Sequence, residues 1–170
     1  MAQLKLNEPV TFGKSGSIRD MDPYGFDLSE HGISWTQDEL AGFSASVAGP
    51  VPLDAILCLT VTARPFIQPG KIERQQLFVF VNGLFVSFRT LTAAEDMEFV
   101  LPSNAFASRG LCVEFVIPTA SSPKSLGISQ DIRKLGVAVT AVLLKLQKSV
   151  ASRPPKQLPG RPDAHGILGR

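Results

Sequence analysis

Apolar residues fall into short runs with a two-residue period, separated by clusters of Gly, Pro, Asn and Ser. Such alternation is typical of strands with one face in a core, and no stretch keeps a helical period. The predicted strands span residues 4–12, 33–36, 40–47, 55–63, 75–81, 84–90, 97–101, 111–117 and 137–146. We therefore expect an all-β fold, a two-sheet antiparallel β-sandwich of jelly-roll-like kind with about nine strands.

The clearest local prediction is a hairpin over residues 75–90. Asn82 and Gly83 can adopt the positive φ angles of a type I′ turn, which joins two strands with the right twist. Counting outward from this turn places Phe88 on the same side as Leu77. The other side then holds Phe78, Phe80 and Phe85. Because both sides are apolar, we expect a loop, a helix or a partner protein to cover the second one.

The composition changes near residue 148. Residues 1–148 carry the strand pattern and are predicted to form the β-sandwich domain. Residues 149–170 hold four prolines and four basic residues against one acid, so we expect a mobile Pro-rich basic tail. The tail is either a solvated terminus or a docking peptide for an acidic surface or anionic lipid headgroups.

Charge and hydropathy exclude several classes of protein. A net charge of +2 without a basic stripe argues against nucleic-acid binding. The start MAQLKLNEPV does not resemble a secretory signal, so we expect a cytoplasmic protein. The longest apolar stretch, residues 135–144, is about half the length of a membrane-spanning helix. Cys58 and Cys112 lie in apolar runs, where free thiols act as small buried hydrophobes.

Motifs that support catalysis, metal binding or a cofactor are absent from the sequence. Gly42-Phe-Ser44-Ala-Ser46 lacks the second glycine of a nucleophile elbow, and Gly13-Lys14-Ser15 lacks the upstream glycine of a phosphate-binding loop. The two histidines, His31 and His165, do not make a histidine-rich metal site. We expect no catalytic residue and no cofactor.

Two further groups of residues each have two interpretations. Asp20, Asp22 and Asp27 can supply oxygen ligands to calcium, or they satisfy the backbone of the turns around Pro23 and Gly25. The single tryptophan, Trp35, can stack on a sugar ring, or it fills the sandwich core.

The most distinctive segment is 122–136, SPKSLGISQDIRKLG. Asp131 and Arg133 point the same way if this stretch is extended. Arg133 can then bind Asp131 or another carboxylate such as Glu30, and so brace the connection before the last strand. Alternatively, Arg133 recognises a ligand.

This segment, together with the FVFVNG hairpin at 78–83, Pro65-Phe66 and the EHGISW stretch at 30–35, resembles the β-sandwich module that accompanies bacterial glycosyltransferases and other polysaccharide-biosynthesis proteins. The resemblance covers residues 25–146. It implies a glycan or the glycosyltransferase machinery as partner, and ligand-binding roles for Trp35, Arg133, Asp131 and Glu30. The chain carries no transferase domain.

These observations leave three hypotheses. The first is a non-catalytic accessory module of bacterial surface-polysaccharide biosynthesis that binds glycan or docks on the synthetic machinery. The second is a structural or assembly subunit that forms a homo-oligomer without a sugar site, favoured if the apolar hairpin side is exposed. The third is a small glycan hydrolase with paired carboxylates among Asp96, Glu98 and Glu114.

Overall fold

The structure is a computed structural model that describes residues 2–49, 51, 55–102, 105 and 110–147. Its elements are β1 (Gln3–Leu4), β2 (Pro9–Thr11), the short 3-10 helix η1 (Ser17–Asp20), β3 (Phe26–Asp27), β4 (Ser34–Thr36), β5 (Leu40–Val47), β6 (Ile56–Pro65), β7 (Gln75–Val81), β8 (Leu84–Leu91), β9 (Glu95–Leu101), β10 (Gly110–Val116) and β11 (Val137–Gln147). The all-β prediction is confirmed, with eleven strands in the described part of the chain rather than about nine.

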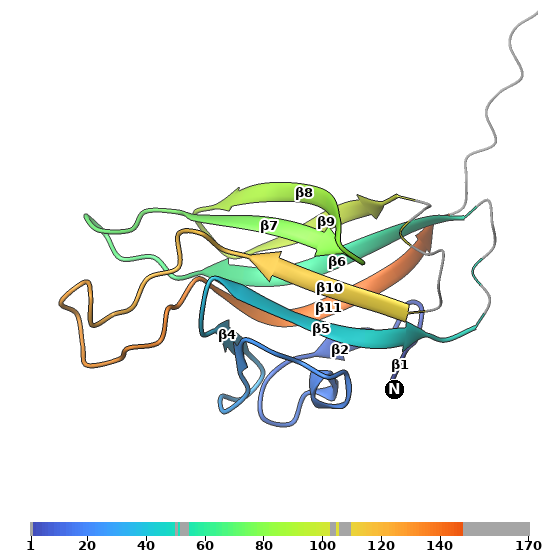
Figure 1. The fold of residues 1–170 in the computed structure, drawn as a ribbon, viewed down its shortest axis with the longest axis horizontal. Coiled ribbons are helices and arrows are strands. Elements are labelled where there is room, and N and C mark those ends of the chain that lie inside the picture. The colour runs from blue at the N-terminus through green and yellow to red at the C-terminus, as the bar shows by residue number, and fades with distance from the viewer. Residues whose placement is uncertain (1, 50, 52–54, 103–104, 106–109, 148–170) are drawn as a thin grey trace, which may run out of the picture.

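The strands form two sheets that lie over one another (Figure 1). The five-stranded sheet has the order β1-β5-β10-β7-β8. The six-stranded sheet has the order β3-β4-β11-β6-β9, with β2 also paired to β11. Between them lies one apolar core that includes Phe12, Phe43, Phe99 and Phe115. The alternation along each strand therefore turns one set of side chains inward and leaves the other set on the two outer surfaces.

Two predictions about the N-terminal third are wrong. The predicted strand 4–12 is split into β1 and β2, which belong to different sheets. Between them Asn7 adopts a positive φ of 62°, which interrupts the extended backbone, and its N–H bonds to the Leu144 carbonyl. β1 also pairs with β5 in parallel, whereas we expected only antiparallel pairing. The short strand β3 was not predicted because two residues are too few to show alternation.

The hairpin turn is confirmed, but the expected pairing beyond it is wrong. Asn82 and Gly83 both have positive φ, 49° and 75°. After Phe80 pairs with Phe85, the next residue, Val86, has no partner, and Phe78 pairs with Phe88. This β-bulge shifts the register by one residue. Phe88 therefore lies on the outer side with Phe78, not on the side of Leu77.

Two long connections meet at one end of the sandwich (Figure 1). They are residues 66–74, between β6 and β7, and residues 117–136, between β10 and β11. The Lys71 ammonium donates a hydrogen bond from the first to the Leu126 carbonyl of the second. In the described part of the chain, no helix is long and apolar enough to cross a membrane. The predicted tail at 149–170 lies outside the described residues.

Candidate functional site

Four phenylalanines form a continuous apolar surface on the outer side of the β7–β8 hairpin. We call this surface, made of Phe78, Phe80, Phe85 and Phe88, the aromatic face. The rings of Phe78 and Phe88 stack with centroids 5.7 Å apart, and those of Phe80 and Phe85 meet edge-on at 5.6 Å. Phe85 and Phe88 are each 54% exposed. In the described part of the chain, therefore, no loop or helix covers Phe85 and Phe88, and cover by a partner protein stays a prediction.

The aromatic face continues across the sheet in two rows of paired residues. In one row Phe80 lies beside Glu114 of β10, which in turn pairs with Gly42 of β5. In the other row Phe78 lies beside Val116. Paired residues in a ladder point to the same side of the sheet. The Glu114 carboxylate thus lies directly beside the aromatic face.

Tyr24 completes the row from outside the sheet. Its backbone pairs with Gly42 at the edge of β5, and its hydroxyl donates a hydrogen bond to Glu114 Oε1 over 2.9 Å. A Cβ atom on Gly42 would lie 2.5 Å from the Tyr24 hydroxyl oxygen and 2.6 Å from the Val113 carbonyl oxygen, so a glycine is needed here.

Desolvation and the neighbouring Glu114 carboxylate raise the pKa of Tyr24 well above its ordinary value. The phenol therefore stays protonated at neutral pH and remains a hydrogen-bond donor. Glu114, only partly buried, remains next to it as an acceptor. Together the two residues add polar groups to a surface that is otherwise aromatic.

This surface has the parts that a sugar ring requires. Aromatic rings cover the apolar C–H side of a pyranose, and a carboxylate accepts hydrogen bonds from sugar hydroxyls. Binding surfaces commonly combine an apolar area with a few fixed polar groups. The arrangement therefore offers both apolar and hydrogen-bonding contacts for binding.

Trp35 lies elsewhere, on the outer side of the six-stranded sheet. It pairs with Ala138 of β11 and is not a member of the buried core, so the core interpretation is wrong. The Arg64 guanidinium lies over its ring, 5.3 Å from the centroid, and Phe66 meets it edge-on at 6.1 Å. A role for Trp35 in stacking on a sugar stays a prediction, and Arg64 already occupies one face of its ring.

The brace at Arg133 is confirmed. Its guanidinium binds the carboxylates of Asp131 and Asp27, and Asp131 also accepts a hydrogen bond from the Arg133 backbone N–H over 3.0 Å. Asp27, not Glu30, is therefore the second carboxylate. In β3, Asp27 pairs with Trp35 of β4. Because Arg133 binds Asp27, Arg133 and Trp35 lie in the same region of the structure. Whether either residue binds a ligand stays a prediction.

The acidic candidates do not assemble into a metal site among the described residues. Asp96 lies on the same outer side of β9 as Glu98, and its carboxylate accepts a hydrogen bond from the Thr62 hydroxyl. In the described part of the chain, no three potential ligands converge on a common point, and Asp27 of the calcium candidates Asp20, Asp22 and Asp27 is engaged by Arg133. The side chains of β9 and β10 alternate so that Glu98 and Glu114 lie on opposite outer surfaces of the sandwich. A hydrolase pair made from these two is therefore excluded.

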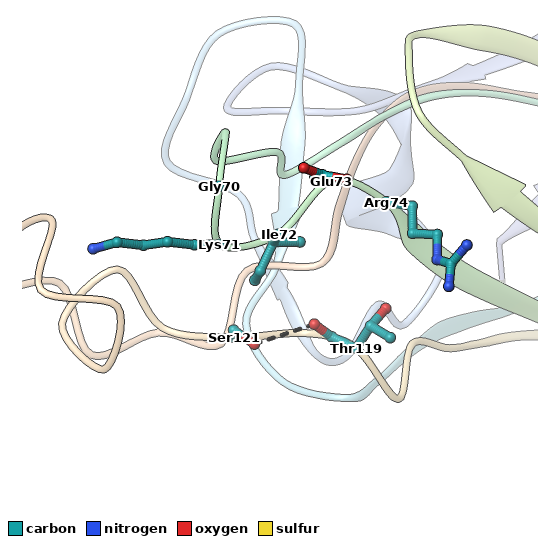
Figure 2. Close-up of a pocket in the computed structure, with 7 residues that line it drawn as sticks. All are labelled: Gly70, Lys71, Ile72, Glu73, Arg74, Thr119 and Ser121. Carbon is teal, nitrogen blue, oxygen red and sulfur yellow. Dashed lines mark hydrogen bonds between the residues drawn. The ribbon is translucent and has the colours of Figure 1, made fainter.

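A groove of about 610 Å³ lies where the two long connections meet (Figure 2). It is lined by Gly70, Lys71, Ile72, Glu73, Arg74, Thr119 and Ser121. Figure 2 shows the side chains of Lys71 and Arg74 pointing in opposite directions. Lys71 is also bound to the Leu126 carbonyl. The charged groups that line the groove do not converge, so the groove is a weaker candidate for a binding site than the aromatic face.

Comparisons with known proteins place the chain in no family. No family model and no curated protein matches it. Solved structures of similar fold include the CBM36-1 domain of a multidomain xylanase from the hindgut metagenome of Trinervitermes trinervoides, at 7% identity and a TM-score of 0.45 over 82% of this chain and 95% of that one. A CBM36 carbohydrate-binding module in complex with calcium and xylotriose has 7% identity and a TM-score of 0.41, over 82% of this chain and 99% of that one. A CBM4 structure has 8% identity and a TM-score of 0.42, over 84% of this chain and 96% of that one. These likenesses are too distant to assign a function.

Proposed function

We propose that this chain is a non-catalytic binding module whose aromatic face binds glycan. The observation that carries the proposal is the strip of exposed phenylalanine rings placed in register with the Tyr24–Glu114 pair. Two rings that are each 54% exposed are a liability in water unless a ligand or partner covers them. A glycan matches both the apolar rings and the adjacent hydrogen-bonding groups.

The biological setting of the proposal is bacterial surface-polysaccharide biosynthesis, with the module acting as an accessory to glycosyltransferase machinery. This part depends on the resemblance carried by residues 122–136 and 78–83. The neighbouring genes test it, because we expect glycosyltransferases or polysaccharide exporters among them. A neighbourhood without either would contradict the setting and leave the glycan proposal intact.

A glycan array, followed by measurement of Kd for the best oligosaccharide, tests the binding proposal. Burying a whole phenylalanine side chain is worth about 1.5–3 kcal/mol. Because 54% of Phe85 and of Phe88 is exposed, covering each gains roughly 1 kcal/mol, which is about fivefold in Kd. We expect the double variant Phe85→Ala, Phe88→Ala to bind about 25-fold more weakly.

The matched control removes two other exposed apolar side chains, Val100 and Ile132, which are 62% and 72% exposed. The double variant Val100→Ala, Ile132→Ala should bind like the wild type. Equal loss in both double variants, or no binding to any glycan by the wild type, would overturn the proposal.

A second candidate function is self-assembly through the same face, and the exposure of Phe85 and Phe88 favours it. In a homo-oligomer the face would be covered by another copy of the chain. Light scattering over a range of concentrations separates the two functions. A monomer that binds glycan supports the first, and an oligomer that dissociates on the substitution Phe88→Glu supports the second.

A further inference from the structure

Charged residues are almost absent from the five-stranded sheet. Its strands β1, β5, β7, β8 and β10 contain two, Arg89 and Glu114. Arg89 pairs with Leu77, whose side chain is in the core, and its guanidinium lies 5.0 Å from the ring centroid of Phe99 in the other sheet. Arg89 is thus directed toward β9. Glu114 is the one charged strand residue on the outer surface of this sheet.

The carboxylate of Glu114 is held toward the aromatic face. Its Oε1 accepts the hydrogen bond from the Tyr24 phenol over 2.9 Å, and Tyr24 is fixed by its backbone pairing with Gly42. Among the described residues no donor contacts its Oε2. One oxygen is therefore anchored, and the other is left to bind a ligand lying on Phe80 in the neighbouring strand.

We infer that Glu114 determines the charge selectivity of the aromatic face, which takes neutral and amine-bearing glycans and rejects glycans with carboxylate or sulfate groups. The inference rests on the proposed glycan-binding function and deepens it. A carboxylate accepts hydrogen bonds from hydroxyl groups and, more strongly, from ammonium groups. It repels an anionic sugar, and no cation among the strands of this surface offsets the repulsion.

The test compares three β-1,4-linked polymers coupled to the same sensor surface. Hydroxyethylcellulose is neutral, chitosan carries amines, and carboxymethylcellulose carries carboxylates. We expect the wild type to bind chitosan at least as tightly as hydroxyethylcellulose, and carboxymethylcellulose about tenfold more weakly than the neutral polymer. The preference should shrink at high salt, because salt screens charges in a partly exposed site.

Glu114→Gln keeps the shape of the side chain and removes its charge, so this variant should bind the three polymers with similar affinity. Glu98→Gln is the matched control, since it removes the same charge from the opposite outer surface. It should keep the wild-type preference. This control also separates selectivity at the face from attraction through net charge.

Each outcome bears on one of the two claims. Charge preference that persists in Glu114→Gln, or that disappears equally in Glu98→Gln, overturns the inference and leaves the proposed function standing. A wild type that binds none of the three polymers counts against the proposed function itself, and this inference then fails with it.

Discussion

Arg133 links the 117–136 connection to β3, so replacing it should destabilise the fold by a measurable amount. The substitution Arg133→Met keeps most of the aliphatic stem and removes the guanidinium. The side chains of Arg133, Asp27 and Asp131 are 35%, 13% and 25% exposed. Removing one partner of a fully buried pair costs about 3–5 kcal/mol, and an exposed pair contributes about 0–1 kcal/mol. For this intermediate exposure we expect a loss of about 2 kcal/mol, or a fall in Tm of roughly 4–8 °C.

The neighbouring residue provides the control. Lys134 binds Asp38 and Glu39 at the surface, where these two acids are 66% and 52% exposed. Lys134→Met should therefore leave Tm unchanged within error. Urea denaturation and calorimetry measure both variants. A loss for Arg133→Met as small as that for Lys134→Met would refute the role of Arg133 as a brace.

The effect of Arg133→Met should depend on pH. Hydrogen bonds from Ser29 and then the Arg133 guanidinium lower the pKa of Asp27, and the guanidinium lowers the pKa of Asp131. A carboxyl with a depressed pKa adds stability above its unfolded-state pKa of about 3.9 and loses it as the pH falls through the folded value. The difference between wild type and Arg133→Met should be constant near neutral pH and shrink below about pH 4. A difference that grows in acid would contradict the ion pairs.

Three further predictions concern single positions. Tyr24 is the only tyrosine, so phenolate absorbance follows it alone; it should titrate well above the ordinary value near 10, and lower in Glu114→Gln. Gly42→Ala should displace the Tyr24 ring, bring its titration back toward 10 and weaken glycan binding, because the added Cβ meets the hydroxyl oxygen. Gly83→Ala should lower the unfolding free energy by about 1 kcal/mol in urea titrations, since Gly83 has a φ of 75° with nothing near its Cβ position.

Alternation predicted most of the strands, because inward and outward side chains must differ in a sandwich. It did not predict the register of the hairpin beyond its turn. Val86 and Ser87 are compatible with either the inner or the outer side of β8. The sequence therefore does not predict the bulge at Val86 that turns Phe88 outward. The composition of the aromatic face could therefore be predicted only for Phe78, Phe80 and Phe85.

The contacts of the candidate site depend on residues far apart in the chain. The pairing of Asp131 with Arg133 could be predicted from the sequence, because in an extended chain the side chains of residues i and i+2 point to the same side. Asp27 lies 106 residues from Arg133, and Tyr24 lies 90 residues from Glu114, so neither contact has a local signal. The one sequence clue was Gly42, since a glycine inside a strand often marks the close approach of another group.

Binding of glycan to the aromatic face is tested by mapping backbone amide chemical shifts while the best-binding oligosaccharide of the array is titrated into the protein. We expect the shifts to concentrate on β7, β8 and β10 around Phe78, Phe85 and Glu114, and the fluorescence of the single tryptophan, Trp35, to stay unchanged. Shifts that concentrate instead around Trp35 and Arg133 on the six-stranded sheet would show that the aromatic face is not the glycan site.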